Sequence, residues 1–191
     1  MIIYFVRHGE TEWNKKEIVQ GHKDSPLTLR GRNNAEKLGR ILRDKNIEII
    51  YSSDLGRCVQ TSKVINKWLK VKIIKTKELR ERNFGDFNGR PNRKVKETLD
   101  LNNPDEKAPN GESFNEQKKR AVSFIQRLFA KKFKKNLLVI HDGTARAILS
   151  ERYDANFNSK KCDTSTGMVY SIEANNRIKN DSKINKYKLT K

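Results

Sequence analysis

The sequence predicts an α/β fold, a three-layer α/β/α sandwich whose mostly parallel central sheet is flanked by helices. Short apolar runs typical of buried strands alternate with segments whose apolar residues recur at helical spacing. Two of the apolar runs, residues 2–6 and 136–140, each lead into a histidine and a glycine. The 191 residues suit one domain with a full core and are too few for two large ones, so we expect a single domain over residues 1–191.

Six segments are expected to form strands. The first, second and fourth are buried apolar runs without a helical period. The last two lie near the C-terminus and are expected to form a hairpin at a sheet edge. In chain order the six segments are residues 2–6, 47–51, 71–76, 136–140, 167–173 and 184–189.

Helices are expected where apolar residues form one stripe and a capping residue precedes it. Thr28 is the expected N-cap of the first helix, and Ser52, Ser53 and Asp54 form a capping cluster before the second. The fourth helix is the longest, with an apolar side that includes several phenylalanines. The expected helices are residues 29–44, 55–69, 92–99, 113–133 and 143–153.

The remaining segments are polar and are expected to be loops. Residues 10–26 form the first, residues 78–89 hold Glu81, and residues 102–111 contain two prolines. The tail from Asn175 is polar and basic. We find neither an internal repeat nor a linker, which agrees with a single domain.

The charge of the chain allows several interpretations. Lys and Arg total 42 against 23 acidic residues, a formal net charge of +19. Such a charge can gather nucleic-acid phosphates, steer small phosphorylated substrates, or belong to a solvated basic surface. The lysines are spread along all the helices, without the aromatic motifs of RNA-binding sheets or zinc-finger spacing. The solvated surface is therefore preferred, and a nucleic-acid partner is not expected.

Other features indicate the compartment. The two cysteines, Cys58 and Cys162, show no pairing pattern, which favours reduced thiols. No signal peptide is visible at the N-terminus, and no stretch approaches the roughly 18 apolar residues of a membrane span. We expect a cytoplasmic protein without a membrane partner, either a monomer or a homodimer.

Polar residues at the strand ends suggest an anion site. Arg7 and His8 follow the first strand, where open α/β sheets collect ligands. The simpler alternative is a strand end with two solvated residues. His141 ends the fourth strand in the same way, so neighbouring parallel strands would bring both imidazoles to one edge. Arg57 lies in the first turn of a helix, an unfavourable place for a cation unless an anion binds there.

Five linked motifs then resemble the histidine phosphatase superfamily, which includes cofactor-dependent phosphoglycerate mutases. Their order and spacing cover the chain to about Val169. The motifs are Arg7-His8-Gly9-Glu10-Thr11 with Trp13-Asn14, the stretch from Gln20 to Gly31, Ser52 to Thr61, Leu79 to Gly85, and His141-Asp142-Gly143. The resemblance implies the three-layer fold of the phosphoglycerate mutase-like proteins.

The resemblance also implies roles for three residues in catalysis. His8 matches the histidine that attacks phosphorus and carries the phosphoryl group. Glu81 matches the general acid that protonates the leaving oxygen and then activates water; taken alone, it could instead be an exposed carboxylate paired with a neighbouring arginine. His141 matches a second histidine that binds phosphate and, when protonated, offsets its charge.

Three further residues match the phosphate-binding set of the family. Arg7 and Arg57 match a clamp of planar donors that suits phosphate oxygens. Asn14 is expected to donate another hydrogen bond to the phosphoryl group. No cluster of Cys, His and carboxylates has metal-ligand spacing, and a phosphate-loop motif is missing, so neither a metal nor another cofactor is expected.

The expected activity is that of a metal-independent phosphatase of the histidine acid phosphatase type. It would hydrolyse small-molecule phosphate esters through a phosphohistidine. The alternatives are a cofactor-dependent phosphoglycerate mutase and, in a different class, a non-catalytic protein that binds polyanions or nucleic acid on the same fold. The mutases carry an insertion after the Glu81 motif that this chain lacks, which favours hydrolysis. Asp142 stands where many relatives have glycine, and the sequence does not decide its role.

Overall fold

The computed structural model describes residues 1–174 and 183–188. These residues contain a six-stranded sheet in the order β3-β2-β4-β1-β5-β6. Strands β1 to β4 run parallel, while β5 and β6 are antiparallel at one edge, as the expected hairpin requires. The strands are β1 (Ile2–Arg7), β2 (Ile49–Ser53), β3 (Lys72–Thr76), β4 (Lys135–Ile140), β5 (Met168–Glu173) and β6 (Lys183–Lys188).

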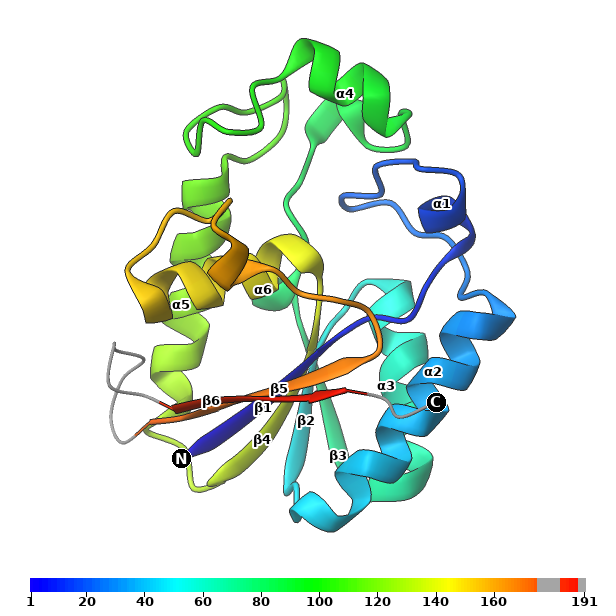
Figure 1. Cartoon of the computed structure of the whole chain (residues 1–191), viewed down its shortest axis with the longest axis vertical. Helices are drawn as coiled ribbons and strands as arrows, with labels where there is room; N and C mark the ends of the chain where they lie inside the picture. The colour runs from blue at the N-terminus through cyan, green and yellow to red at the C-terminus, as the bar shows by residue number, and fades with distance from the viewer. Residues whose placement is uncertain (175–182, 189–191) are drawn as a thin grey trace.

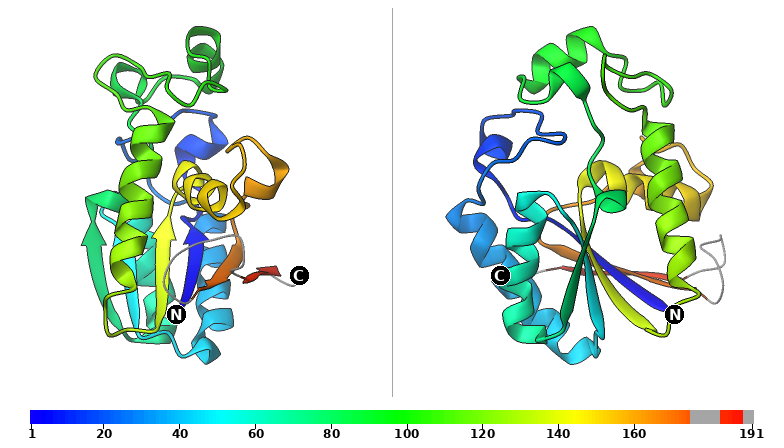
Figure 2. Two further views of the ribbon diagram at one scale, coloured as in Figure 1. Left: turned by 90° about the vertical axis from the view of Figure 1, so that its left-hand side faces the viewer. Right: turned by 180° about the vertical axis from the view of Figure 1, so that it is seen from behind.

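Helices cover both faces of this sheet, which confirms the predicted three-layer sandwich (Figures 1 and 2). Side chains of β4 alternate between the two layers, as the pleat of a strand requires. Leu138 and Ile140 pack toward α5 and α6, whereas Leu137 and Val139 pack toward α2 and α3. The four helices are α2 (Leu29–Leu42), α3 (Gly56–Leu69), α5 (Phe114–Leu128) and α6 (Asp142–Tyr153).

Capping agrees with the prediction for α2 but not for α3. Thr28 Oγ1 accepts from the backbone N–H of Gly31 at 2.9 Å, as expected for the N-cap of α2. The N-cap of α3 is Leu55, which makes no capping bond through its side chain. A residue distant in the chain, Asp24, accepts from the backbone N–H of Gly56 at 2.6 Å instead. The first turn of α3 is therefore capped through tertiary structure.

The bounds of most elements agree with the expectation to within two residues, and the larger differences lie at two other places. The predicted loop after β1 contains a short helix, α1 (Glu12–Lys15), because Thr11 and Asn14 form a capping box around its first turn. Helix α5 ends at Leu128 and not at residue 133. Strand β4 begins at Lys135, so the intervening lysine-rich residues form the turn between helix and strand.

Residues 84–111 form a segment, here called the cap, beyond the carboxyl ends of the parallel strands (Figure 1). It contains α4 (Asn92–Thr98), which agrees with the expected short helix. The cap has its own apolar cluster, separate from those beneath the sheet helices. The buried members of this cluster are Phe87, Val95, Leu99 and Ala108. The cap thus has an apolar anchor of its own at the end of the sheet where both histidines lie.

Three further expectations concern membrane spans, the two cysteines and the C-terminal tail. Within the described residues, no helix is long and apolar enough to cross a membrane. Cys58 and Cys162 are both unpaired and buried. Leu189, the last residue of the expected final strand, and most of the tail from Asn175 lie outside the described residues.

Candidate active site

The first histidine lies where β1 ends, and its ring is almost fully buried. The backbone N–H of His8 donates to Ile140 O at 2.9 Å, which holds the end of β1 against β4. The Nδ1 atom lies 2.8 Å from Gly9 O, the backbone acceptor that a neutral, attacking imidazole needs. Burial, followed by the charges of Arg57 and Arg7, lowers the pKa of His8 well below its ordinary value. Nδ1 therefore carries the proton, and Nε2 keeps its lone pair.

Gly9 is required by a close approach of two backbones. A Cβ atom at this position would lie 2.6 Å from Gly31 O, in the first turn of α2. Its backbone N–H donates to Thr61 Oγ1 at 3.0 Å, and that hydroxyl donates to Arg57 O at 2.7 Å. The turn that carries His8 is thus fixed to both α2 and α3.

The structure brings the second histidine against the first. The ring centroids of His8 and His141 are 5.2 Å apart, in an edge arrangement, so the two strand ends converge as predicted. His141 Nδ1 accepts from Arg57 Nε at 3.2 Å, and Nε2 lies 2.9 Å from Ser53 Oγ. Burial and the Arg57 charge lower the pKa of His141 well below its ordinary value. In this structure His141 is a buried partner of Arg57, and its protonation beside a phosphate stays a prediction.

Arg57 reaches into the site from the first turn of α3 and is fully buried. Beyond His141, its guanidinium donates to Lys23 O and Asp24 Oδ1 through Nη1, at 2.8 and 2.9 Å, and to Gly21 O through Nη2 at 2.8 Å. The anion expected beside this cation is, in this structure, the carboxylate of Asp24. Arg57 therefore connects α3 to the loop that follows α1.

Arg7 has more donor capacity left than Arg57. Its Nη1 lies 3.1 Å from Asp142 Oδ1, and its buried Nε has no partner among the described residues. Asp142 also accepts from Arg146 Nε at 3.0 Å and from Thr164 Oγ1 at 2.8 Å. Burial alone would raise the pKa of Asp142, but Arg7, Thr164 and Arg146 together hold it below its ordinary value. The residue left open by the sequence is an ionised anchor for Arg7.

Glu81 approaches from the opposite side, at the N-terminus of α6. Its Oε1 accepts from Arg82 N and Gln117 Nε2, both at 2.9 Å, and its Oε2 accepts from Gly143 N at 3.2 Å. A Cβ at position 143 would overlap with Glu81 Oε1, so a side chain there would displace the carboxylate. Arg80 pairs with Asp54 at 2.6 Å, so its guanidinium is engaged away from Glu81. The alternative of an exposed carboxylate paired with a neighbouring arginine finds no support.

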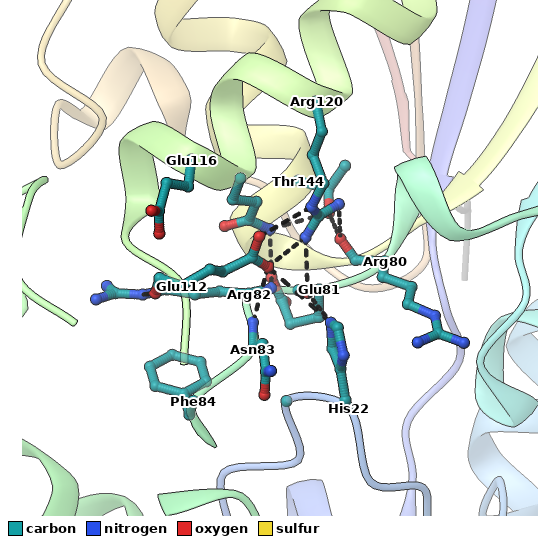
Figure 3. Close-up of polar contacts among 12 residues, drawn as sticks. His22, Arg80, Glu81, Arg82, Asn83, Phe84, Glu112, Glu116, Arg120 and Thr144 are labelled. Carbon is teal, nitrogen blue, oxygen red and sulfur yellow. Dashed lines mark hydrogen bonds and ion pairs between the residues drawn. The ribbon is translucent and has the colours of Figure 1, made fainter. Parts of the chain in front are cut away.

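The backbone around Glu81 is held by a second arginine (Figure 3). Arg120 of α5 donates to the carbonyls of Glu78, Arg80 and Glu81 at 2.7–2.9 Å and pairs with Glu112. His22 Nε2 lies 3.0 Å from Glu81 O on the other side. The segment is therefore fixed from two directions before any ligand binds.

One cavity of about 310 Å³ joins these groups. Asn14 lines it, and its Oδ1 is occupied by the N–H and hydroxyl of Thr11, at 3.0 and 2.9 Å. His141 lies behind Arg57 and is not part of the lining. The lining residues are Arg7, His8, Asn14, Glu17, Ile18, Val19, Gln20, Gly21, Arg57, Glu81, Phe84, Asn92 and Asp142. Five of the six sequence-predicted residues therefore face one space.

Sequence reasoning missed several residues that hold the site. Asp24, Ser53 and Arg120 act across long chain separations, and the sequence assigned them no role at the site. Gln117 does carry one, because it is a polar residue on the otherwise apolar stripe of α5. Among the described residues, no three His, Cys, Asp or Glu side chains group as a metal site.

Comparisons with known proteins identify the family. The sequence model of the histidine phosphatase superfamily (branch 1) matches residues 3–178. The chain is 33% identical over 150 residues to the uncharacterized phosphatase PhoE of Bacillus subtilis, covering 78% of this chain and 76% of that protein. It is also 33% identical over 159 residues to phosphoglycerate mutase-like protein 4 of Arabidopsis thaliana, covering 76% and 68% of the two chains.

A solved structure gives the same result. YhfR of Bacillus stearothermophilus superposes with a TM-score of 0.81 at 27% identity, covering 92% of this chain and 93% of that one. The geometry, the family model and these relatives agree across most of the chain. The chain is therefore an enzyme of the histidine phosphatase superfamily and belongs to its branch 1.

Proposed function

We propose that the chain is a metal-independent phosphomonoesterase that hydrolyses small phosphorylated metabolites through a phosphohistidine. The observation that carries this proposal is the state of His8. It is a buried, neutral imidazole with Nδ1 held by Gly9 O, in one cavity with Arg7 and Glu81. A nucleophile, a phosphate anchor and a carboxylate are the groups that phosphoryl transfer to histidine requires.

In the proposed first step, His8 Nε2 attacks phosphorus in line with the ester oxygen. The P–N bond forms as the P–O bond breaks, and Glu81 gives its proton to the departing alkoxide. Arg7, Arg57 and the amide of Asn14 hold the non-bridging oxygens. In the second step Glu81 takes a proton from water, whose oxygen attacks phosphorus and releases inorganic phosphate and neutral His8.

His141 has a different role in this proposal from the one that the resemblance implies. Because its Nδ1 accepts from Arg57 Nε and its Nε2 contacts Ser53 Oγ, both ring nitrogens already have protein partners. We assign His141 the role of orienting the Arg57 guanidinium, which it contacts on the side away from the cavity. Direct binding of phosphate by a protonated His141 stays a prediction.

The charge of the cavity supports hydrolysis over the mutase alternative. Arg7 and Arg57 are the cations among the lining residues, and Arg57 already donates to four protein acceptors. Three acids, Glu17, Glu81 and Asp142, also line the space. A bisphosphate cofactor would bring a second phosphate, for which the lining residues offer no further cation. A monoester brings one phosphate, which Arg7 and Arg57 can bind.

The test is a panel of phosphate monoesters, assayed in chelator with wild type, His8→Ala and an exposed-residue control, Lys119→Ala. The panel includes sugar phosphates, phosphoserine and 3-phosphoglycerate, the last with and without its bisphosphate. We expect phosphate release by wild type and the control, lost in His8→Ala. Isomerisation of phosphoglycerate without release would instead make the enzyme a mutase.

The basic surface provides the remaining alternative. A polyanion-binding protein immobilised on a column would retain RNA or DNA in low salt, and its His8→Ala variant would retain them equally well. Retention by both forms, with no turnover by folded wild type, would replace the catalytic proposal.

A further inference from the structure

Gln117 is a buried amide on the apolar side of α5. Its side chain has no exposed surface, and its neighbours along the same stripe include Phe114 and Ala121. A buried amide is costly unless its polar atoms are hydrogen-bonded. Its presence on this stripe therefore calls for a partner.

That partner is the candidate general acid. Gln117 Nε2 donates to Glu81 Oε1 at 2.9 Å and to Thr144 Oγ1 at 3.1 Å. The other end of the amide, Oε1, is buried and has no partner among the described residues. Both amide atoms lie about 3 Å from the position that a Cβ on Gly143 would take, beside the Glu81 carboxylate. Gln117 thus places a hydrogen-bonded donor, Nε2, and an acceptor without a described partner, Oε1, beside the Glu81 carboxylate.

The proposed chemistry requires Glu81 in two protonation states. An ionised carboxylate only accepts hydrogen bonds, so the N–H of Gln117 suits it. A protonated carboxyl must donate one hydrogen bond, and an N–H at that place offers no acceptor. Half a turn about the terminal C–C bond of Gln117 exchanges its oxygen and nitrogen and supplies the acceptor.

The surroundings allow this half-turn at little net cost. In both orientations one end of the amide contacts Glu81 and the other end lies in the same pocket without a partner. The Thr144 hydroxyl donates to Arg80 O at 2.9 Å, but Arg80 O also accepts from Arg120 Nη1 at 2.7 Å. The hydroxyl can therefore turn to the amide oxygen while the Arg80 carbonyl keeps a donor.

We propose that Gln117 is the positioning residue of Glu81, donating to its carboxylate when ionised and, after a half-turn of the amide, accepting from its carboxyl proton. The inference rests on the proposed function, in which that proton leaves on the alcohol product and is replaced from water. Gln117 itself gains and loses no proton. Before the ester binds, the carboxyl proton is donated to the amide oxygen of Gln117. As the ester binds, that proton turns to the leaving oxygen, and the amide turns back to donate to the carboxylate that forms.

The test compares two leaving groups. Gln117→Met keeps the length of the side chain and removes both polar ends, and Lys119→Met on the exposed side of α5 is the matched control. An alkyl phosphate from the active panel needs its leaving oxygen protonated, whereas p-nitrophenyl phosphate needs little help. The value of kcat/KM reports the steps through phosphoryl transfer, so it isolates the protonation of the leaving group.

We expect Gln117→Met to lower kcat/KM about tenfold for the alkyl phosphate, the loss of one hydrogen bond to a charged group, and less than about twofold for p-nitrophenyl phosphate. In Glu81→Gln the further change to Gln117→Met should have no added effect. Equal losses on both substrates, or no loss on the alkyl ester, would overturn the assignment.

Two controls separate the possible failures. Should Glu81→Gln also leave the ratio of the two substrates unchanged, the proposed role of Glu81 fails, and not only that of Gln117. Gln117→Leu serves as a second variant, with thermal unfolding measured for each. Failure of both variants to fold would assign Gln117 a structural role and likewise overturn the proposal.

Discussion

Replacing Asp24 by alanine is expected to destabilise the protein through two kinds of contact. The carboxylate accepts from Gly56 N at 2.6 Å, which caps α3, and from Arg57 Nη1 at 2.9 Å. Loss of a cap costs about 1 kcal/mol, and loss of a hydrogen bond to a charged group about 1.5–3 kcal/mol. The Arg57 side chain is 1% exposed, so water replaces little of its lost bond. We expect the free energy of unfolding to fall by about 3 kcal/mol.

For a chain of this length each kcal/mol changes Tm by about 2–4 °C, which gives a decrease of about 6–12 °C for Asp24→Ala. Asp24→Asn keeps an oxygen that can accept from Gly56 N but loses the charge, so about half of the decrease is expected. Asp44→Ala is the control, because that side chain is 77% exposed and should leave Tm unchanged. Thermal unfolding followed by circular dichroism measures all three. An Asp24→Ala protein that melts with wild type would refute the reasoning.

Three further predictions follow from the same contacts. His8 and His141 are buried and have lowered pKa values, so the unfolded chain binds more protons than the folded chain below pH 6.5. The free energy of unfolding should therefore fall by about 1 kcal/mol per histidine for each pH unit below that value. Urea titrations at pH 7.5 and 5.5 measure this decrease. A decrease that survives replacement of both histidines would contradict this cause. Gly143→Ala should lower alkyl phosphatase activity at least about tenfold, because its Cβ displaces Glu81; full activity would exclude the observed position of that carboxylate. Ser113→Ala should cost about 1 kcal/mol in urea unfolding through loss of the α5 capping box, and an unchanged midpoint would contradict it.

Much of the fold follows from local patterns. The apolar runs specify buried strands, and the capping residue Thr28 specifies where the first long helix begins. Errors concentrate where a tertiary contact overrides the local signal. Helix α3 begins within one residue of its expected start, but β2 extends through Ser53, and Asp24 supplies the cap from another loop.

For the candidate site, the positions of the main residues were predictable from the sequence, but the protonation of His141 was not. Motifs and strand ends placed Arg7, His8 and Glu81 around one cavity, as the structure has them. The state of His141 was not predictable, because burial and the adjacent guanidinium of Arg57 decide its protonation. Both depend on packing that the sequence does not display.

The sequence by itself determined the buried strands and the histidine that follows each of two of them, because strand period and strand-end residues are local properties. The pairing of these two strands side by side was decided by the tertiary structure. Only the tertiary structure decided what those side chains contact. Asp24 lies 33 residues from Arg57, and Gln117 lies 36 from Glu81. Such pairs depend on how loops and helices pack over the strand ends, and the free energy of that packing belongs to the whole chain and not to any one segment.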